Sequence, residues 1–393
     1  MRFRVRPKSG PARPQLVLHI GDPKTGTSSI QRALQDKSVR CDTRNILPWI
    51  KMNARNLAFD LVSEDEEKSR QKAARVRKWI DSSKADYAVI SSEFMARADP
   101  EKLKIVLEHH LPEYIETARV IAYVRPHASR FLAAYIQRTK TGHYFGDFDS
   151  FHDDVNRDNP LTLHYSRRFG HWNKVFDGRF TLRPFIRSEL QDGDAVSDFY
   201  SVLLGDEPFD VSDRIEENVA VTTRSLSGMR LLHQHLKNQK IDPTSRSLLG
   251  TAIANYFIPM GDIVGQKPKL DRTTAERIIA TYRDDAQRLD DAFFSRPMMT
   301  EALDASIRDT VDDPLNLDVD RYFSAAEVAD MESLSAAIVR SYRTCPKIWA
   351  LHHRARTRKH VLGPRAVAEA TANRRTIKEL DAHLSDLASV LRG

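Results

Sequence analysis

The sequence predicts an α/β protein with a central parallel β-sheet flanked by helices, followed by a helical C-terminal extension. Two observations indicate this class. Short, β-branched apolar runs alternate with amphipathic stretches through the first two hundred residues, which is typical of parallel strands joined by helices. Beyond residue 220 the apolar periodicity is almost entirely helical, with prolines between the segments. With 393 residues, 41% of them hydrophobic, the chain can bury a full core.

The predicted elements follow from the spacing of apolar residues. Strands are predicted where short apolar runs occur, at residues 16–20, 86–93, 118–124 and 179–185. Residues 38–60 show no regular spacing and are predicted to be irregular. Helices are predicted where the period is three to four, at residues 30–34, 63–80, 102–109, 129–137, 151–177, 195–204, 222–239, 245–257, 271–294, 323–342 and 365–391.

The same patterns suggest three parts of the chain. Residues 1–13 are expected to be a basic, flexible N-terminus, because they carry arginines and lysine without an apolar stretch long enough for a signal peptide. Residues 14–295 are expected to form the α/β domain and residues 296–393 the helical extension. No run approaches the roughly 18 apolar residues of a membrane span.

The two cysteines indicate a compartment. Cys41 and Cys345 are too few and too far apart in sequence for a disulfide framework or a cysteine metal cluster. This usage is typical of a reducing environment, and a cytoplasmic location is therefore expected.

Residues 19–29 are the most informative stretch. A buried strand is predicted just before them and an amphipathic helix just after. A strand that leads through a glycine-containing turn into a helix can cradle phosphate, because the helix N-terminus has unpaired N–H groups and the positive end of the dipole. Lys24 adds a positive charge beside Gly26, and hydroxyl donors come from Thr25, Thr27, Ser28 and Ser29.

This loop differs from the Walker pattern. There, lysine follows the second glycine and is itself followed by serine or threonine. Here Lys24 precedes Gly26. An ordinary corner between strand and helix, with a lysine present by chance, is the alternative interpretation.

Polar residues also follow two other predicted strands. Ser91, Ser92 and Glu93 end the run at 86–93, and Arg125 follows the run at 118–124. Ligands of parallel α/β sheets bind at the carboxyl ends of the strands. We therefore expect these residues to meet the phosphate loop at one edge of the sheet.

The net charge of the chain says less about its binding partners than the motifs do. A formal charge of +7 on a chain that is 29% charged suits an anionic small molecule or polyanion, and no nucleic-acid-binding motif occurs, so no nucleic-acid partner is expected. Residues 351–360 form a basic run, predicted to be an exposed face, with an anionic polymer or peripheral contact with a membrane surface as the minority interpretation. Its adjacent histidines lack further ligands at metal spacing, so no metal is expected.

Three motifs in order resemble the sulfotransferases that use 3′-phosphoadenosine-5′-phosphosulfate (PAPS), in particular the bacterial carbohydrate type. Residues 19–28 are similar to the family's 5′-phosphosulfate loop, and residues 124–135 to its 3′-phosphate motif. Residues 168–199 show a familiar order of helix, strand and helix. The match covers residues 14–290. It implies a P-loop-like, three-layer fold and PAPS as sulfuryl donor, without a metal.

The resemblance implies roles for particular residues. Lys24 would contact the 5′-phosphosulfate and its bridging oxygen, with donors from Thr25, Gly26, Thr27 and Ser28. Arg125 would bind the 3′-phosphate. The family's catalytic base comes shortly after the strand that here ends in Ser91, Ser92 and Glu93, so Glu93 is the candidate base. The family's serine for the 3′-phosphate falls on Ala133. Ser129 lies one helical turn earlier on the same face, and we infer that it supplies the hydroxyl instead.

Other polar residues near these motifs have simpler interpretations. The alternative interpretation of Glu93 is a carboxylate at a helix N-terminus, capped after Ser91 or Ser92. His19, inside an apolar strand, is expected to be buried and satisfied. Arg183 either reaches the site or pairs with an acid, and His127 and His143 are expected at the surface.

The leading hypothesis is transfer of a sulfuryl group from PAPS to a hydroxyl of a saccharide or glycolipid, with Glu93 as base and Lys24 stabilising the leaving phosphate. A kinase-like nucleotide enzyme is a second hypothesis. A third is a non-catalytic module that binds a glycan or a partner on a sulfotransferase scaffold, which Ala133 would allow. The sequence indicates neither the acceptor nor the oligomeric state.

Overall fold

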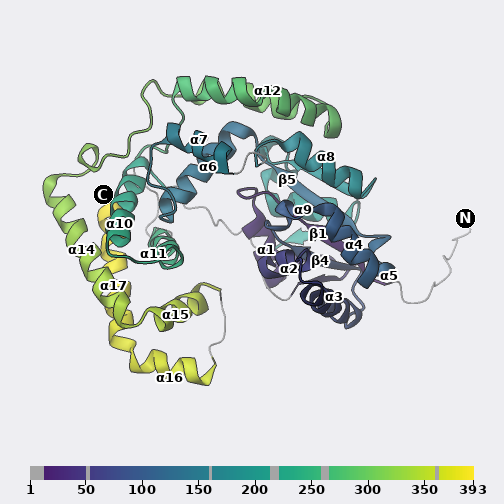
Figure 1. Ribbon diagram of the computed structural model, residues 1–393, viewed down its shortest axis with the longest axis horizontal. Helices are drawn as coiled ribbons and strands as arrows, with labels where there is room; N and C mark the ends of the chain where they lie inside the picture. The colour runs from purple at the N-terminus through teal and green to yellow at the C-terminus, as the bar shows by residue number, and fades with distance from the viewer. Residues whose placement is uncertain (1–12, 50–53, 159–161, 213–220, 258–264, 359–362) are drawn as a thin grey trace, which may run out of the picture. The chain divides into compact units, whose positions relative to one another are not determined.

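A computed structural model describes residues 13–49, 54–158, 162–212, 221–257, 265–358 and 363–393 (Figure 1). The predicted flexible N-terminus lies outside the described residues, apart from Arg13. The chain divides into two compact units. The first unit comprises residues 1–130, 159–215 and 278–306, and the second comprises residues 131–158, 216–277 and 307–393.

The first unit is built on a five-stranded sheet in the order β3-β4-β1-β5-β6. All four neighbouring pairs are parallel, and β1 is central, with Leu18 paired to Ile90 of β4 and to Val120 of β5. If only the five strands of this sheet are numbered along the chain, their order in the sheet is 2-3-1-4-5. The strands are β1 Gln15–His19, β3 Ile46–Pro48, β4 Tyr87–Ser91, β5 Arg119–Val124 and β6 Phe180–Pro184.

Helices cover both faces of this sheet. Side chains alternate between faces along a strand, so Val17, Val89 and Ile121 share one face, where they pack with buried residues of α1 (Thr27–Asp36) and α9 (Ala195–Leu204). Alternate residues such as Leu16 and Leu18 are also fully buried, on the opposite face. Figure 1 shows β1, β4 and β5 beside α1 and α9. The predicted class, a central parallel sheet flanked by helices, is confirmed.

Shorter elements complete the first unit. A two-stranded antiparallel ribbon pairs β2 (Val39–Arg40) with β7 (Asp210–Val211). Two helices, α6 and α12, begin in one unit's sequence and end in the other's, because the unit boundaries fall inside them. The remaining helices that lie wholly or partly in the first unit are α2 Arg55–Leu61, α3 Glu66–Asp81, α4 Pro100–His110, α5 Pro112–Ile115, α6 His127–Lys140, α8 Tyr165–Val175, α12 Arg272–Phe293 and α13 Met298–Ala305.

The second unit is helical and has its own hydrophobic core. The buried face of α17 repeats at three- and four-residue spacing, and it packs mainly on α14 and α11. Buried residues of α10, such as Leu232 and Leu236, join the same core. The bounds are α7 Phe148–Asp158, α10 Thr223–Asn238, α11 Pro243–Tyr256, α14 Ala325–Thr344, α15 Pro346–Arg358, α16 Pro364–Ala372 and α17 Arg374–Arg392.

The predicted boundary at residue 295 does not coincide with a change of unit. Residues after 306 are helical, as predicted, but they share a core with α10 and α11, which precede that boundary. Periodicity marks which face of a helix is apolar but not which other helix covers it. For this reason the sequence could not assign α10 and α11 to the second unit.

Local predictions differ from the structure in several places, including β2 and α2, which lie largely within the stretch 38–60 that was predicted to be irregular. Residues 151–177 form two helices, α7 and α8, rather than one, and Pro160 stands between them in the sequence. Residues 365–391 are likewise divided, into α16 and α17. Residues 46–48, predicted to be irregular, form the edge strand β3, which is too short to show a period.

The basic run at 351–360 is not simply an exposed face. Residues up to 358 belong to α15, where His353 is buried and stacks on Trp349 with ring centroids 5.1 Å apart. Arg356 pairs with Asp381 of α17 at 2.7 Å. Helical spacing turns one side of this run toward the core of the second unit. Residues 359 and 360 lie outside the described residues.

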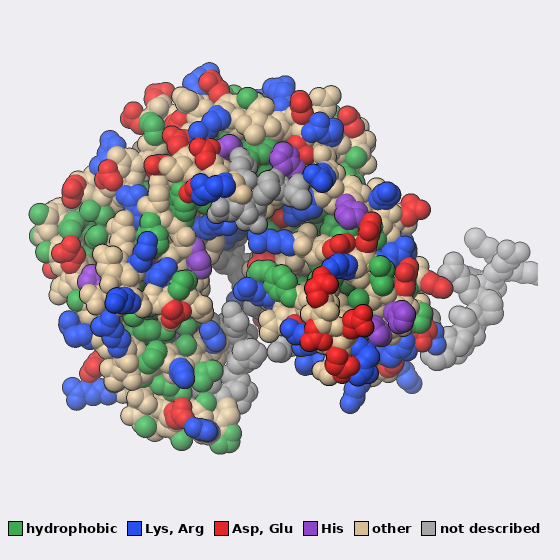
Figure 2. All heavy atoms as spheres, viewed as in Figure 1, with side chains coloured by type: hydrophobic (Ala, Val, Ile, Leu, Met, Phe, Trp, Pro, Cys, Tyr) green, Lys and Arg blue, Asp and Glu red, His purple; other side chains and the backbone are tan. Residues whose placement is uncertain are grey.

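The surface shown in Figure 2 has acidic and basic side chains interspersed, in line with a charge of +7 spread over a highly charged chain. Within the described residues, no helix combines the length and the apolar character needed to cross a membrane. Cys41 and Cys345 are both free thiols.

Gly228 in α10 provides a test of packing in the second unit. A Cβ there would overlap Leu391 and lie 3.2 Å from both Met331 Sδ and Phe323 Cζ. We expect Gly228→Ala to lower the free energy of unfolding by about 1–3 kcal/mol through overpacking. The control is Gly170→Ala in α8, where nothing lies within 4 Å. It should raise stability by about 0.5–1 kcal/mol through helix propensity. Thermal and denaturant melts measure both; equal effects of the two substitutions would contradict the packing described.

Candidate active site

The loop after β1 is held in a defined conformation by its own hydrogen bonds. The Thr25 hydroxyl donates to the Asp22 carbonyl at 2.5 Å, and the Asp22 N–H donates to the Tyr123 carbonyl of β5 at 3.3 Å. Lys24 has a φ of 72°, the left-handed region that costs a residue with a Cβ of the order of 1 kcal/mol. The surrounding structure therefore fixes the backbone of Lys24 in an unfavourable conformation, which is typical of ligand-binding loops.

Gly26 ends this loop and begins α1. Its φ is 72°, and a Cβ would lie 2.5 Å from the Ala195 Cβ at the start of α9. Glycine is therefore required both for the backbone conformation and for the close approach of α9. As N-cap, Gly26 has no side chain to bond the first N–H groups of α1, so these donors remain open to a ligand. Thr27 in this turn is buried, whereas Ser28 is exposed.

Asp22 is the buried centre of an ion-pair network. Its carboxylate accepts hydrogen bonds from Arg168 Nη1 of α8 at 2.8 Å and from Arg130 Nε of α6 at 3.2 Å. Only 1% of its side chain is exposed. Burial disfavours the charge of Asp22, but the two arginines outweigh this effect and hold its pKa below 3.8. The network joins the loop after β1 to two helices.

Arg125 lies beside this network without an acidic partner. Its Nε donates to the Ser129 hydroxyl at 3.1 Å and its Nη1 donates to the Lys24 carbonyl at 3.2 Å. Among the described residues no carboxylate lies within ion-pairing distance of it. Burial and the nearby charge of Arg130 lower the pKa of Arg125, although an arginine stays protonated. An unneutralised, half-buried guanidinium favours an anionic ligand.

Glu93 follows β4 at the same edge of the sheet. Burial raises the pKa of its carboxyl above 4.5, and the charge of Lys24 opposes this shift. Asp22 and Arg130 also act on it, so Glu93, Lys24 and the network belong to one electrostatic cluster. The cations of that cluster are Lys24, Arg97, Arg125, Arg130 and Arg168, and its carboxylates are Asp22 and Glu93.

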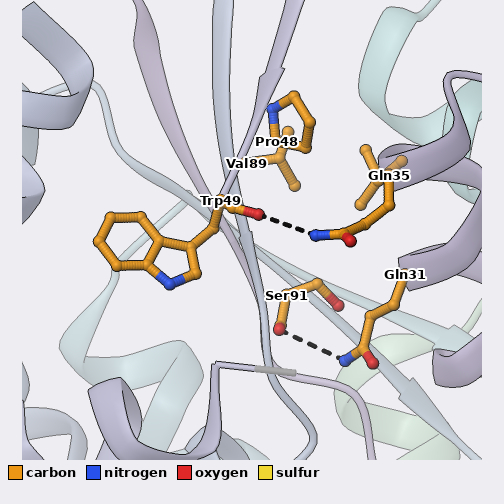
Figure 3. Close-up of a pocket in the computed structure, with 7 residues that line it drawn as sticks. Gln31, Gln35, Pro48, Trp49, Val89 and Ser91 are labelled. Carbon is orange, nitrogen blue, oxygen red and sulfur yellow. Dashed lines mark hydrogen bonds between the residues drawn. The ribbon is translucent and has the colours of Figure 1, made fainter. Parts of the chain in front are cut away.

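A small pocket lies between α1 and the ends of β3 and β4 (Figure 3). On one side of it the Gln31 amide donates to the Ser91 carbonyl at 3.3 Å, and the Gln35 amide donates to the Trp49 carbonyl at the same distance. Figure 3 shows the Trp49 indole pointing away from the two glutamines. The first bond ties α1, which follows the loop after β1, to the strand that leads to Glu93, and the second ties α1 to the end of β3.

The other polar residues considered in the sequence have mixed outcomes. His19 is buried, with Nδ1 2.8 Å from the Ser91 hydroxyl, but its Nε2 has no hydrogen-bond partner, so it is only half satisfied. Burial lowers its pKa to about 3, which leaves the ring neutral at pH 7. Arg183 pairs with Asp198 rather than with the cluster. His143 is exposed, as expected.

The expected surface position of His127 is wrong. The side chain is fully buried, with Nε2 3.2 Å from an Asp285 carboxylate oxygen and 3.0 Å from the Leu163 carbonyl. Its ring stacks on Tyr282 at 4.9 Å. These partners come from distant parts of the sequence, so nothing local to His127 indicated that it would be covered.

Three residues of the cluster had no role in the sequence analysis. Arg130 and Arg168 bind Asp22, and two further nitrogens of Arg168 are buried without a partner. The Tyr165 hydroxyl, buried beside them, also lacks one, and burial raises its pKa strongly. An aspartate directly after a buried strand is a signal that a cationic partner must exist, but it does not say which arginine provides it.

One group of metal-ligand side chains occurs among the described residues, formed by Asp99, Glu101 and His171. Existing bonds account for its members. Asp99 caps α4 through the N–H groups of its first turn, and Glu101 lies 3.1 Å from His171 Nε2. That the protein works without a metal stays a prediction.

No protein-family model matches the chain, and no curated protein matches it. Among solved structures, the chain is similar to a sulfotransferase from Alicyclobacillus acidocaldarius, with 13% sequence identity and a TM-score of 0.40. The match covers 73% of this chain and 99% of that chain. A likeness of this extent does not assign an activity, and the function has to be inferred from the site.

Removing the Asp22 charge tests the network. We expect Asp22→Asn to cost about 3–5 kcal/mol of stability at pH 7, because two buried arginines lose their counter-ion. The pKa of Asp22 is depressed in the fold, so its contribution is complete above 3.8 and is lost as the pH falls through the lowered value. The variant's deficit in denaturant melts should therefore shrink in acid.

The matched control is Asp42→Asn. Asp42 pairs with Arg40 at 3.0 Å, but both side chains are 78% exposed, so this substitution should change stability by less than about 1 kcal/mol. A similar deficit for Asp42→Asn and Asp22→Asn, or one for Asp22→Asn that persists unchanged in acid, would contradict the role of Asp22.

Proposed function

We propose that the protein is a sulfotransferase that transfers a sulfuryl group from PAPS to a hydroxyl of a saccharide or glycolipid. The observation that carries the proposal is Arg125, held by hydrogen bonds to Ser129 and to the Lys24 carbonyl, without a carboxylate partner. It supports an anion site next to the open N–H groups at the start of α1. Two anion sites side by side suit a donor with phosphate groups at its 5′ and 3′ ends.

Each residue then has one task. Lys24 and the first turn of α1, with Thr25, Thr27 and Ser28, would bind the 5′-phosphosulfate. Arg125 would bind the 3′-phosphate. Ser129 already accepts from Arg125 and donates to the Pro126 carbonyl, so it orients the guanidinium where the family's serine is replaced by Ala133.

The proposed reaction needs one base and one cation. The Glu93 carboxylate takes the proton of the acceptor hydroxyl, and the acceptor oxygen forms a bond to sulfur. The bond between sulfur and the bridging oxygen breaks, and adenosine 3′,5′-bisphosphate leaves with the electron pair on its 5′-phosphate. Lys24 stabilises this charge. The raised pKa of Glu93 supports the proposal, because a stronger base accepts the proton more readily.

A kinase-like activity fits the site less well. Asp22 is the carboxylate of the loop after β1, and both of its oxygens are held by arginines, so it is not available to bind Mg²⁺. Lys24 is followed by Thr25, as in a Walker loop, but it is preceded by Pro23 instead of the glycine that the Walker pattern requires. Nothing in the described residues favours the non-catalytic module.

Donor binding is the first test. We expect Lys24→Ala and Arg125→Ala each to weaken the binding of adenosine 3′,5′-bisphosphate, measured by calorimetry, at least about tenfold, since each removes a charged contact. The wild type should be stabilised more by this compound than by ATP or AMP. Lys37→Ala is the matched control, because Lys37 ends α1 and also has a positive φ, of 51°. Unchanged affinity in Arg125→Ala, or preference for ATP with Mg²⁺, would contradict the proposal.

The pH profile tests the base. Because the pKa of Glu93 is raised, kcat/KM should fall in acid from a pH above 4.5, the ordinary glutamate value. The charge of Lys24 lowers the pKa of Glu93. The residual activity of Lys24→Met should therefore fall in acid from a higher pH than the activity of the wild type does. Glu93→Gln should lose about 10²–10⁴ in kcat, whereas Glu108→Gln, at an exposed site on α4, should not. Full activity in Glu93→Gln would exclude the base.

A further inference from the structure

A group of one arginine and two phenylalanines lies next to Glu93. The Ala54 N–H donates to the Ser91 carbonyl at 3.4 Å, so α2 begins beside the end of β4 (Figure 1). Arg55, the first residue of α2, places its guanidinium 4.7 Å from the ring centroid of Phe94 and 5.8 Å from that of Phe59. The two rings lie 5.8 Å apart.

This group is accessible and its charge is not neutralised. Phe59 is 47% exposed, one of the most exposed large apolar side chains among the described residues. Arg55 is exposed too, and within the described part of the chain it has no carboxylate partner. Its guanidinium lies over the faces of the two rings, and such contacts are weak at an exposed site.

The position of the group connects it to the proposed chemistry. Phe94 directly follows Glu93, so their Cα atoms are about 3.8 Å apart. A molecule whose hydroxyl reaches the Glu93 carboxylate must extend over the neighbouring surface. Aromatic rings pack against the apolar face of a sugar ring, and a guanidinium binds a carboxylate or sulfate with paired N–H groups.

We propose that Arg55, Phe59 and Phe94 form the acceptor subsite, and that the acceptor is an anionic saccharide. The sugar ring lies against the phenylalanines, and a carboxylate or sulfate on the same or the next sugar pairs with Arg55. This inference rests on the proposed function, which supplies Glu93 as the base. It adds the charge of the acceptor and the residues that select it.

The test measures binding of two probes by calorimetry, in the presence of saturating adenosine 3′,5′-bisphosphate. The anionic probe is an oligosaccharide of alternating glucuronate and N-acetylglucosamine, and the neutral probe is chitotetraose. We expect the wild type to prefer the anionic probe. Arg55→Gln should weaken the binding of the anionic probe about tenfold or more. It should leave the affinities for the neutral probe and for the bisphosphate unchanged. Phe59→Ala should weaken both probes.

Arg75→Gln is the matched control. Arg75 is also exposed and lies 5.8 Å from the Trp49 ring centroid, so the substitution removes the same charge and the same kind of ring contact elsewhere on the first unit. It should leave both probes unchanged. An equal effect of the two substitutions would show a general charge effect and overturn the subsite.

The remaining outcomes separate the two proposals. If the bisphosphate binds but neither saccharide does, or if Arg55→Gln binds the anionic probe as the wild type does, the subsite is overturned and the sulfotransferase proposal stands. If the bisphosphate fails to bind while the anionic probe binds in an Arg55-dependent way, the donor proposal fails and the surface remains an anionic saccharide site. Added salt should weaken the binding of the anionic probe but not that of the neutral probe.

Discussion

The ion pairs of Asp22 are the constraint on which the site depends. A carboxylate buried directly after a central strand is tolerated only because Arg130 and Arg168 both bind it. Those arginines come from α6 and α8, so satisfying one charge fixes the position of two helices against the loop. Arg125 lies five residues before Arg130, two residues ahead of the first residue of the same helix. The bond that neutralises Asp22 therefore also positions the guanidinium that remains free for a ligand.

The surplus of positive charge follows from this arrangement. Asp22 is shared by two arginines, and Glu93 is the second carboxylate of the cluster, so its cations outnumber its carboxylates. The fork of Arg125 also matters, because one nitrogen reaches Ser129 and another reaches the Lys24 carbonyl. A lysine carries its donors on a single nitrogen and lacks the rigid fork with which arginine reaches both acceptors from separate nitrogens. The conformation of the loop after β1 is thus coupled to the position of the Arg125 guanidinium.

What the sequence could predict was local in origin. The strands at 16–20, 86–93, 118–124 and 179–185 were found because each is a short apolar run, and parallel pairing then placed Glu93 and Arg125 at the edge that holds Lys24. What it missed depends on contacts between distant segments. The partners of Asp22 lie 108 and 146 residues away, and Asp285 lies 158 residues from His127. No periodicity carries that information, so His127 was expected at the surface.

The shared core of the second unit has a consequence for the history of the chain. Residues 307–393 bury α14 and α17 against α10 and α11, which stand before α12 in the sequence, and the divisions between units fall inside α6 and α12. Such a segment is not a self-contained module that a gene fusion could append to a finished domain. Without the earlier helices, the faces of α14 and α17 that pack on α10 and α11 would be exposed, although these two helices also pack on each other.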